Sequence, residues 1–499
     1  MIYNFNLGIG WASSGVEYAQ SYRAYVLRNI GQEARFVFTD MFPRDNIIEM
    51  TRNIGFEDHE IIWLYTFFTD FAPEPVSFTL EDLKKTITDT GYSFERDGKI
   101  GRIIFEGENN FYRIYFTNAQ SDLVHRVEMV RRGLLVRKDY FTSKRIFTEY
   151  YAPLDGSAHL YQRRFFNRDG SVAYDEINDD NVIMYKFPDK IICSKEDLIA
   201  YMVSRLKLTS KDMVIIDRTT GQGQAILENV NDAKVGIVVH ADHFSEGSTD
   251  DTNILWNNYY EYSFSMNKHI SFYVTATEDQ NKLMKSQFEK YLGVSPYIAT
   301  IPVGALPELK YPKEPRQPHS FITASRLATE KHVDWLIDAV VEARKAIPDI
   351  TLDIYGKGGA EKDLSDQIER LKATSYIRLM GQQDLTDIYV NYEGYLSAST
   401  SEGFGLTLME AIGSGLPIIG FDVRYGNQNF IDHNKNGYKL PYNNGMERGR
   451  RQKNMVDAII KLCTEADITA FEKHSYKMAE NYLANEVENR WKKLISQMI

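Results

Sequence analysis

Between Phe321 and Gly420, short apolar segments alternate with stretches in which apolar residues recur at the spacing of a helix. Segments that are short and almost entirely apolar are typical of strands buried on both faces of a parallel sheet. A helix between successive strands produces a doubly wound α/β sheet, whose loops at the carboxyl ends of the strands open into one crevice. The predicted strands are residues 321–324, 352–355, 377–380, 394–398 and 417–420.

A second region of the same type precedes this one. Residues 213–216 and 235–239 are predicted to be buried parallel strands, and residues 7–15 are predicted to form a strand that runs into a loop of small residues. A helix predicted over residues 16–30 completes a strand–loop–helix unit, which is how nucleotide-binding α/β domains begin. Five prolines within residues 302–318 indicate a domain boundary between the two regions.

Residues 92–187 have a different texture, with nine Tyr and nine Phe. The dipeptides Asp97-Gly98, Asp155-Gly156 and Asp169-Gly170 favour tight turns between short aromatic or β-branched runs. We therefore expect an antiparallel meander of roughly eight to ten strands, inserted into the first α/β domain. A mixed α+β insertion is the alternative.

The predicted fold is therefore α/β, with two Rossmann-like doubly wound domains and an inserted β-meander. We expect the first domain to be formed by residues 1–75 and 210–305, and the insertion by residues 76–209. The second domain is expected over residues 306–470. An amphipathic helical segment, 471–499, is expected to return to the first domain.

Charge and cysteine content exclude several functions. The 499 residues include 58 basic and 69 acidic side chains, a net charge of −11, which argues against general affinity for nucleic acid or anionic lipid. Cys193 and Cys463 lie 270 positions apart, so we expect neither a disulfide framework nor a Cys-x-x-Cys metal site. No apolar run approaches the ~18 residues of a membrane span, and the N-terminus does not resemble a secretory signal. We expect a cytoplasmic protein, peripheral to the membrane at most.

The densest cluster of candidate site residues is 400–411, directly after a predicted strand. Its glycines allow a ligand to approach the backbone closely, and the amides at the start of the following helix suit a diphosphate. Glu402 and Glu410 lie eight residues apart, so two hydroxyl-bearing ends of one ligand can meet both carboxylates. The alternative makes Glu402 a helix cap and Glu410 a solvated helix residue.

Three further loops follow neighbouring strands of the same predicted sheet. Residues 325–331 bring Arg326 and Lys331, two cations that can bind a diphosphate or, alternatively, lie solvated on the surface. Residues 356–359 and 381–384 end the next two strands. One such loop is weak evidence, but loops from successive strands of one sheet together predict a ligand site.

The first domain contributes its own loops. Its glycine loop at residues 8–15 contains no G-x-G-x-x-G pattern, so NAD or FAD binding is not indicated. His240 and His243 follow the strand at 235–239, where either can bond a substrate hydroxyl or a sugar; a purely structural histidine is the alternative. The chain has no Walker P-loop, His-Glu-x-x-His, Gly-x-Ser-x-Gly or metal-binding Asp-x-Asp sequence. We therefore expect a site in which side-chain cations and helix amides, and no metal, neutralise a diphosphate.

These motifs resemble a known family. Residues 321–437 are similar to the nucleotide-sugar domain of retaining GT-B glycosyltransferases of family 4, through Ala324-Ser325-Arg326-Leu327, Lys331-His332, the Glu402/Glu410 pair and Gly415-Leu416-Pro417. Residues 8–19, 254–260 and 421–427 resemble a narrower group over the whole chain. That group is the GtfA-type subunits, which start O-glycosylation of serine-rich repeat adhesins. The β-rich insertion resembles the add-on domain of that group.

The resemblance implies a retaining transferase that moves N-acetylglucosamine (GlcNAc) from UDP-GlcNAc to Ser or Thr hydroxyls, with no cofactor or metal. It implies catalytic roles for Arg326, Lys331, Glu402 and His240. UDP would contact Gly15, Val16, Glu17, Tyr18, Gln382, Gln383, Thr407, Leu408 and Glu410. The GlcNAc moiety would contact His240, His243, Glu402, Gly403, Phe404 and Gly405.

The resemblance also implies partners. A homologous, non-catalytic GtfB-type subunit would bind through the β-rich insertion and present a Ser/Thr-rich acceptor protein. Two other functions stay open: a family 4 transferase acting on teichoic acid or lipid, and a non-catalytic acceptor-recognition subunit. A non-catalytic subunit would be expected to lose the donor-site charges, whereas this chain keeps Arg326, Lys331, Glu402 and Glu410.

Overall fold

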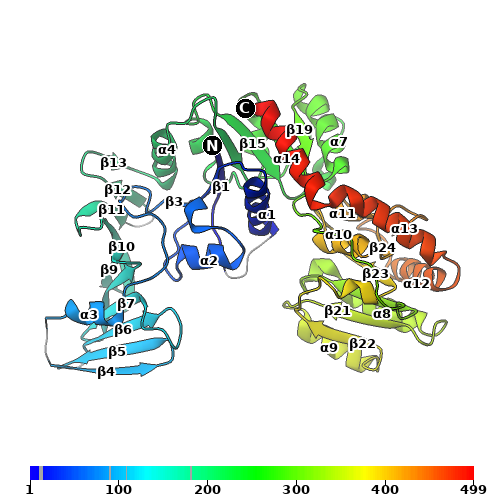
Figure 1. Ribbon diagram of the computed structural model, residues 1–499, viewed down its shortest axis with the longest axis horizontal. Coiled ribbons are helices and arrows are strands. Elements are labelled where there is room, and N and C mark those ends of the chain that lie inside the picture. Colours follow the sequence, from blue (N-terminus) through cyan, green and yellow to red (C-terminus); the bar gives the residue numbers. More distant parts are fainter. Residues whose placement is uncertain (11–14, 89–90, 108, 180–181) are drawn as a thin grey trace. The chain divides into compact units, whose positions relative to one another are not determined.

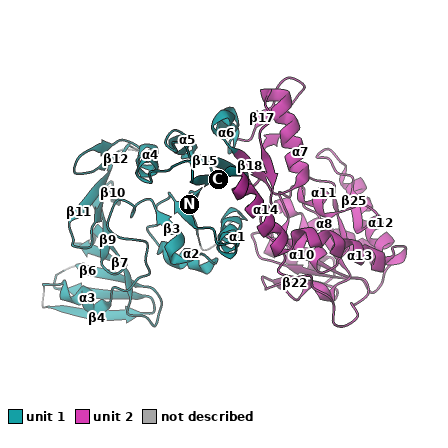
Figure 2. Cartoon of the chain, turned by 45° about the horizontal axis from the view of Figure 1, so that its top comes forward, with its two compact units in different colours: residues 1–238, 258–271, 498–499 teal, residues 239–257, 272–497 magenta. Residues whose placement is uncertain are grey.

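The structure of the chain is a computed structural model that describes residues 1–10, 15–88, 91–107, 109–179 and 182–499 (Figure 1). It divides into two compact units (Figure 2). Unit 1 comprises residues 1–238, 258–271 and 498–499, and unit 2 comprises residues 239–257 and 272–497. Among the described residues, no helix is both long enough and apolar enough to cross a membrane.

Unit 1 begins with the predicted strand–loop–helix unit. Five parallel strands lie in the order β15-β14-β1-β2-β3. They are β1 (Ile2–Asn6), β2 (Ala34–Phe38), β3 (Ile61–Trp63), β14 (Met213–Ile216) and β15 (Lys234–Val239). The helices are α1 (Gly15–Asn29), α2 (Ile47–Asn53), α3 (Leu80–Lys85), α4 (Lys195–Arg205), α5 (Gly223–Leu227) and α6 (Glu261–Ser265).

The first strand ends at Asn6, so the opening strand lies before Leu7, the residue at which the sequence was expected to begin it. Two buried polar residues, Asn4 and Asn6, hide the apolar pattern of β1. Both are hydrogen-bonded: Arg23 Nη1 donates to Asn4 Oδ1 at 2.9 Å, and Asn6 Nδ2 donates to Gln20 Oε1 at 3.2 Å. Buried polar groups are tolerated in a strand when such partners satisfy them.

The insertion forms one antiparallel meander of ten strands, in the order β13 to β4, as the turn dipeptides and aromatic runs predict. Its strands are β4 (Tyr92–Asp97), β5 (Ile100–Phe105), β6 (Phe111–Phe116), β7 (Val124–Arg131), β8 (Leu134–Phe141), β9 (Arg145–Leu154), β10 (Ser157–Phe166), β11 (Val172–Asp179), β12 (Val182–Lys186) and β13 (Ile191–Ile192).

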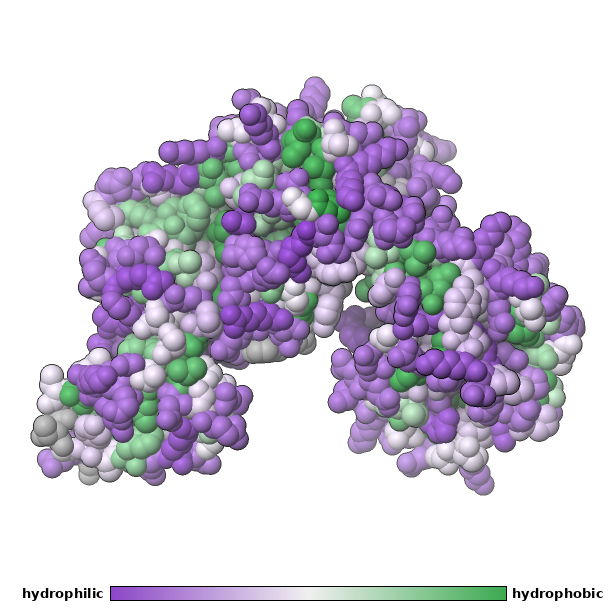
Figure 3. Space-filling view, in the orientation of Figure 1, coloured by the Kyte–Doolittle hydropathy of each residue, from purple (hydrophilic) through white to green (hydrophobic). Residues whose placement is uncertain are grey.

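Aromatic side chains fill the core of this sheet. Ten of the 18 Tyr and Phe side chains between residues 92 and 187 are buried, and only Phe94 and Tyr161 are exposed, at 37% and 40%. Most of the exposed large apolar residues of the insertion are aliphatic, and Figure 3 shows hydrophobic residues in green on the lobe of β4–β7. The exposed aliphatic residues are Ile100, Ile104, Leu134, Leu154, Val172, Val182 and Ile191.

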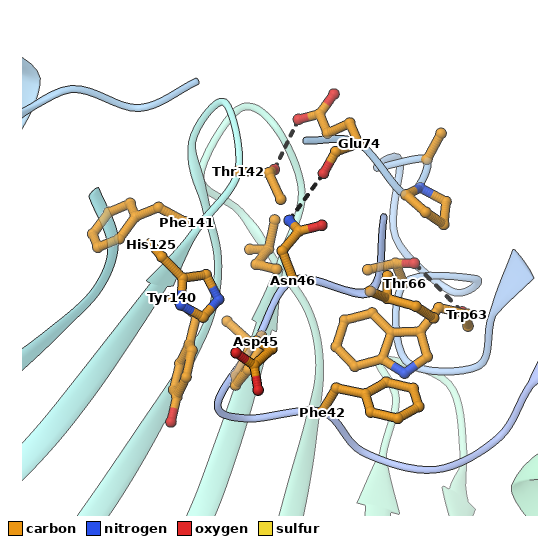
Figure 4. A pocket seen from close by; sticks show the side chains of 15 residues that line it. Phe42, Asp45, Asn46, Trp63, Thr66, Glu74, His125, Tyr140, Phe141 and Thr142 are labelled. Carbon is orange, nitrogen blue, oxygen red and sulfur yellow. Dashed lines mark hydrogen bonds between the residues drawn. The ribbon is translucent and has the colours of Figure 1, made fainter. Parts of the chain in front are cut away.

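A small cavity of about 20 Å³ lies beside this sheet (Figure 4). Residues 42–47, 63–74 and 125–147 contribute its lining, so it lies where the loop before α2 packs on β7–β9. Glu74 closes one side, accepting a hydrogen bond from Thr142 Oγ1 at 2.8 Å. A cavity of this size holds about one water molecule at most, so it is no site for an organic ligand.

Unit 2 contains a six-stranded parallel sheet in the order β22-β21-β20-β23-β24-β25, the doubly wound arrangement that the sequence predicts. Its strands are β20 (Ser320–Ala324), β21 (Thr351–Tyr355), β22 (Ile377–Gly381), β23 (Gly394–Ser397), β24 (Ile418–Phe421) and β25 (Gly437–Leu440). The sequence did not predict β25, a short strand whose third residue is half-buried.

Helices cover both faces of this sheet. The helices of unit 2 are α7 (Glu278–Gln287), α8 (Val333–Ala343), α9 (Glu361–Arg370), α10 (Leu406–Gly413), α11 (Gly426–Phe430), α12 (Arg448–Thr464), α13 (Ile468–Ala479) and α14 (Ala484–Met498). The short strands β16 (Phe244–Ser245), β17 (Leu255–Trp256), β18 (Phe272–Thr275) and β19 (Ile298–Thr300) also belong to it. Arg490 of α14 donates to the Thr300 carbonyl at 3.4 Å, so the C-terminal helix packs beside β19.

Candidate functional site

The candidate site lies where the order of strands in the six-stranded sheet reverses. β20 is the first strand of this sheet along the chain, and its neighbour β23 is the fourth. The loops that follow these two strands lie side by side, and the Thr400 amide donates to the Glu330 carbonyl at 3.3 Å. Ligands of doubly wound sheets bind in the crevice at such a reversal point.

A salt bridge joins these two loops. Lys331 Nζ lies 2.6 Å from Glu402 Oε2, and the two side chains are only 17% and 20% exposed. The sequence placed both residues at one edge of the sheet, and the structure brings them into direct contact. The pair therefore holds a cation and a carboxylate, two groups suited to a phosphate and a sugar hydroxyl, at one point of the site.

Arg326 has a different environment. Its side chain is 74% exposed and pairs with Glu330 at 2.8 Å. A backbone hydrogen bond lowers the pKa of the Glu330 carboxyl, as do the Arg326 guanidinium and Lys331. Arg326 is thus accessible to an incoming anion, and Glu330 is a partner that the sequence did not indicate.

The backbone of Glu402 is held by the segment after β24. The Glu402 amide donates to the Arg424 carbonyl at 3.1 Å, and the amide of Gly426 donates to the Glu402 carbonyl at 2.8 Å. A Cβ atom at Gly426 would lie 2.2 Å from the Phe404 carbonyl oxygen, so only glycine permits this approach. The sequence drew attention to residues 421–427 only through the family resemblance; this pairing is long-range and leaves no local signal.

Glu410 lies on α10, and its carboxyl is not solvated. Because α10 begins at Leu406, Glu402 does not belong to the same helix. Tyr389 donates its hydroxyl to Glu410 Oε2 at 2.9 Å, and burial raises the pKa of the Glu410 carboxyl. Glu402 does not cap the helix either, since Gly405, with a φ of +87°, is the N-cap residue.

The start of α10 has no side-chain cap, which leaves amides there for an anion. Thr407 Oγ1 lies 3.0 Å from the Tyr395 hydroxyl. The Leu408 amide, however, donates to the Gly405 carbonyl at 3.0 Å, and the Leu408 side chain is buried. Leu408 therefore uses its amide within the helix, contrary to the expectation that it faces a phosphate.

The glycine loop at residues 356–359 packs against the neighbouring loop. Cβ atoms at Gly356 and Gly358 would lie 1.9 Å and 2.2 Å from the carbonyl oxygens of Ser325 and Leu327. These glycines are thus explained by close backbone packing that fixes the segment carrying Arg326.

Gln382 and Gln383 are exposed at the end of β22, and Gln383 Nε2 donates to the Met380 carbonyl at 2.8 Å.

The two candidate histidines differ. His240 is half-buried, and its carbonyl oxygen would lie 3.0 Å from a Cβ atom at Gly403, so the loop with His240 packs against the Glu402 loop. His243 is fully buried: Nε2 lies 2.6 Å from Gln287 Oε1 and Nδ1 lies 3.1 Å from the Tyr425 hydroxyl. This geometry corrects the expectation that His243 faces a sugar and makes it a structural residue.

His243 makes the stability of the protein depend on pH. Burial lowers its pKa to about 4, below its value of 6.5 in the unfolded chain. Between these values the unfolded state binds more protons, so stability is fully present above pH 6.5 and falls as the pH drops toward 4. The slope from one such histidine is about 1.4 kcal/mol per pH unit.

We expect His243→Gln to reduce the slope of unfolding free energy against pH by about 1 kcal/mol per pH unit between pH 5 and 6.5, where the unfolded histidine is only partly protonated at the upper end. Denaturant titrations at several pH values measure it, with His59→Gln, at an exposed position, as the control. An unchanged slope in His243→Gln would contradict the buried, neutral state of this ring.

Residues predicted to close the site from unit 1 lie at the start of α1. Gly15 and Tyr18 are exposed and Val16 is half-buried. Glu17 is buried, and its carboxylate accepts a hydrogen bond from Asn6 at 3.3 Å and lies 3.5 Å from Arg218. The rest of the predicted loop, residues 11–14, lies outside the described residues.

No group of three or more His, Cys, Asp or Glu residues able to hold a metal ion occurs in the part of the chain that the structure describes. The cations at the site are those of Arg326 and Lys331.

Sequence reasoning missed Tyr389 and Tyr395, which support α10 from β23 and the turn before it. Neither belongs to a motif, because only the fold brings them to Glu410 and Thr407.

Two parts of the chain match known protein families. Residues 93–189 match the family "GtfA extended beta-sheet domain", and residues 309–474 match "Glycosyl transferases group 1". The chain is 51% identical to the GtfA subunit of a UDP-N-acetylglucosamine–peptide N-acetylglucosaminyltransferase from Streptococcus gordonii, over 100% of this chain and 98% of that protein.

Two solved structures are similar over the full length. A GtfA/B complex matches with a TM-score of 0.97 and 51% identity, over 100% of this chain and 99% of that one. The pneumococcal O-GlcNAc transferase GtfA, in complex with UDP and GlcNAc, matches with a TM-score of 0.91 and 46% identity, over 100% and 98%. The chain therefore belongs to the family of GtfA subunits of UDP-N-acetylglucosamine–peptide N-acetylglucosaminyltransferases.

Proposed function

We propose that this chain transfers GlcNAc from UDP-GlcNAc to Ser or Thr hydroxyls of a serine-rich repeat adhesin, with retention of configuration. The observation that carries the proposal is the Lys331–Glu402 pair at the reversal point of the sheet, 2.6 Å apart, in a chain that is 51% identical to a GtfA subunit over its whole length. That identity favours the protein acceptor over the teichoic acid or lipid that the sequence left open. The retained charged residues favour a catalytic over a non-catalytic subunit.

The residues have distinct roles in this proposal. Lys331 and Arg326 neutralise the diphosphate, and the amides at the start of α10, with Thr407, add hydrogen bonds to it. Glu402 and the backbone of Gly403, Phe404 and Gly405 hold the sugar, which His240 also faces. Glu410 bonds the ribose. The uracil lies at Gln382 and Gln383, and Gly15, Val16, Glu17 and Tyr18 close the nucleotide site.

The reaction follows from where charge develops. As the bond from the anomeric carbon to the phosphate oxygen breaks, negative charge grows on the leaving diphosphate and positive charge on the sugar ring. Preorganised cations and amides stabilise the first, and in this proposal the Glu402 carboxylate stabilises the second. The acceptor hydroxyl attacks from the same face and gives its proton to the departing phosphate oxygen. Because Lys331 and Arg326 supply positive charge, we propose that no metal is needed.

The wider organisation is also part of the proposal. The domain boundaries are those expected from the sequence, with the insertion at residues 76–209; the match of residues 93–189 to the extended β-sheet family supports it. A GtfB-type subunit binds this insertion, which its exposed aliphatic side chains support. The chain works in the cytoplasm, attached to the membrane at most peripherally, which its two free cysteines support.

A reconstituted transfer assay tests the proposal. The chain, purified with its partner subunit, is given UDP-GlcNAc and a Ser/Thr-rich peptide in the presence of EDTA. We expect the peptide to gain GlcNAc at a rate that EDTA does not change and that falls without the partner. Loss of transfer in EDTA would contradict metal independence, and donor hydrolysis without transfer would require a different acceptor.

A further inference from the structure

A large polar cleft lies in unit 2 beside the candidate donor site. Its volume is about 1210 Å³, above the roughly 300–1,000 Å³ typical of small-ligand pockets. Its walls come from residues 242–247 after β15, the start of α7, residues 422–425 after β24 and residues 439–444 after β25. Arg326, Lys331, Gln382 and Glu410 do not line it, so it is a different space from the proposed diphosphate and uridine site.

The cleft shares a wall with the loop that carries Glu402. Thr400 and Ser401, which line it, directly precede Glu402 in the chain. Arg424 and Tyr425, which also line it, are hydrogen-bonded through their backbone to Glu402, at 3.1 Å and 2.6 Å. A ligand in the cleft therefore contacts the same backbone that positions Glu402, next to where the sugar reacts.

The charges of the lining exclude a second nucleotide or another anion. Four carboxylates face two cations, and both cations have partners in the protein. Arg424 pairs with Glu246 at 3.2 Å, and Lys439 donates to the Gln428 carbonyl at 3.3 Å. Most of the remaining side chains carry hydroxyl or amide groups. Such a surface fits a ligand without negative charge that offers many hydrogen-bond donors.

Asp242 is a lining residue that can accept such a donor. Its Oδ1 atom is buried and has no hydrogen-bond partner in the described part of the chain. The nearest cation, Arg424 Nε, lies 3.8 Å away, beyond hydrogen-bond distance. The Asp242 side chain as a whole is 36% exposed on the wall of the cleft, so the accessible part of its carboxylate can accept a hydroxyl or amide donor from a ligand. Burial also raises the pKa of the Asp242 carboxyl.

We propose that this cleft binds an extended Ser/Thr-rich segment of the acceptor polypeptide, with a hydroxyl or amide of the segment donating to the accessible part of the Asp242 carboxylate. The inference rests on the proposed function, which supplies a polymeric acceptor rich in hydroxyls and free of phosphate. A polypeptide acceptor is large enough to need a cleft of this size, and it carries no phosphate that would require a free cation. It must also reach the reacting sugar, which agrees with the contact between the cleft and the Glu402 loop.

Variants that narrow the cleft test this inference. Asn444 and Gly247 are exposed residues of its lining, and a Cβ atom at Gly247 meets nothing within 4 Å, so both positions accept a larger side chain. We expect Asn444→Trp and Gly247→Trp, assayed in the complex with the partner, to raise the KM for a Ser/Thr-rich peptide at least tenfold more than the KM for UDP-GlcNAc. Asn485→Trp, at an exposed position of α14 outside the lining, is the matched control and should change neither KM.

Asp242→Ala provides a second, independent variant. We expect its peptide KM to rise at least fivefold, with a melting temperature close to that of the wild type.

A peptide KM unchanged in all three variants, while the wild type transfers GlcNAc, would overturn the inference and leave the proposed function intact. Equal rises in the KM for peptide and the KM for UDP-GlcNAc would assign the cleft to the donor and overturn the inference. Binding of glycosylated peptide alone would make a glycan the occupant of the cleft and would overturn it as well. A wild type that turns over no UDP-GlcNAc would overturn the proposed function and this inference with it.

Discussion

Replacing Lys331 with alanine is expected to lower kcat for GlcNAc transfer by about 10²–10³-fold while the protein stays folded. The Lys331 ammonium lies 2.6 Å from Glu402, and the Lys331 side chain is only 17% exposed. Its positive charge is therefore held at a fixed position that a solvated surface lysine could not supply. In the proposed reaction it stabilises the charge that grows on the diphosphate, and a preorganised donor at such a position typically has this effect. Steady-state kinetics with UDP-GlcNAc and peptide measure the loss.

The matched control is Lys345→Ala. Lys345 also pairs with a glutamate, Glu342, but its side chain is 72% exposed and lies on the outer surface at the end of α8. Its replacement should leave kcat within twofold of the wild type. Near-normal turnover in Lys331→Ala would remove this residue from the reaction, and a collapse of its thermal melting transition would show that the pair serves folding instead.

Replacing Asp217 with alanine is expected to reduce the free energy of unfolding by about 3–5 kcal/mol. Asp217 and Arg23 are 0% and 3% exposed, and their bidentate pair has distances of 2.7 Å and 2.9 Å. Gln20 Nε2 also donates to Asp217 at 2.7 Å. The variant leaves the Arg23 charge buried beneath β1 without its counter-charge, which costs far more than the pair contributes when intact.

Chemical denaturation followed by circular dichroism measures this effect, with Asp58→Ala as the control. Asp58 pairs with Arg52 on the surface, where the side chains are 33% and 51% exposed. Exposed pairs of this kind contribute about 0–1 kcal/mol, so the control should unfold almost as the wild type does. Equal losses in the two variants would mean that the Arg23–Asp217 pair is not buried as the structure describes.

The sequence was most informative where local patterns determine structure. Continuous apolar segments predicted the strands of the six-stranded sheet, and turn dipeptides predicted the meander of the insertion. β1 was misplaced because Asn4 and Asn6 are buried polar residues whose partners, Arg23 and Gln20, lie on α1. Such hydrogen bonds follow from packing and leave no period in the sequence.

The candidate site was predicted in outline only. The loops carrying Lys331 and Glu402 were expected at one sheet edge, since parallel strands place all such loops there. Their direct ion pair, the pairing of Glu402 with Arg424 and the burial of His243 between Gln287 and Tyr425 depend on contacts between distant segments. The glycines at 356 and 358 suggested a ligand loop, but close packing against Ser325 and Leu327 explains them.

The anomeric configuration of the product tests the central claim most directly. The complex is incubated with UDP-GlcNAc, an α-linked donor, and a Ser/Thr-rich peptide, and the glycopeptide is examined by proton NMR. A retaining transferase with its donor at the Lys331–Glu402 pair gives GlcNAc α-linked to a Ser or Thr oxygen, and Lys331→Ala gives the same product far more slowly. A β-linked product, or GlcNAc on any other atom, would contradict the reaction proposed for this site.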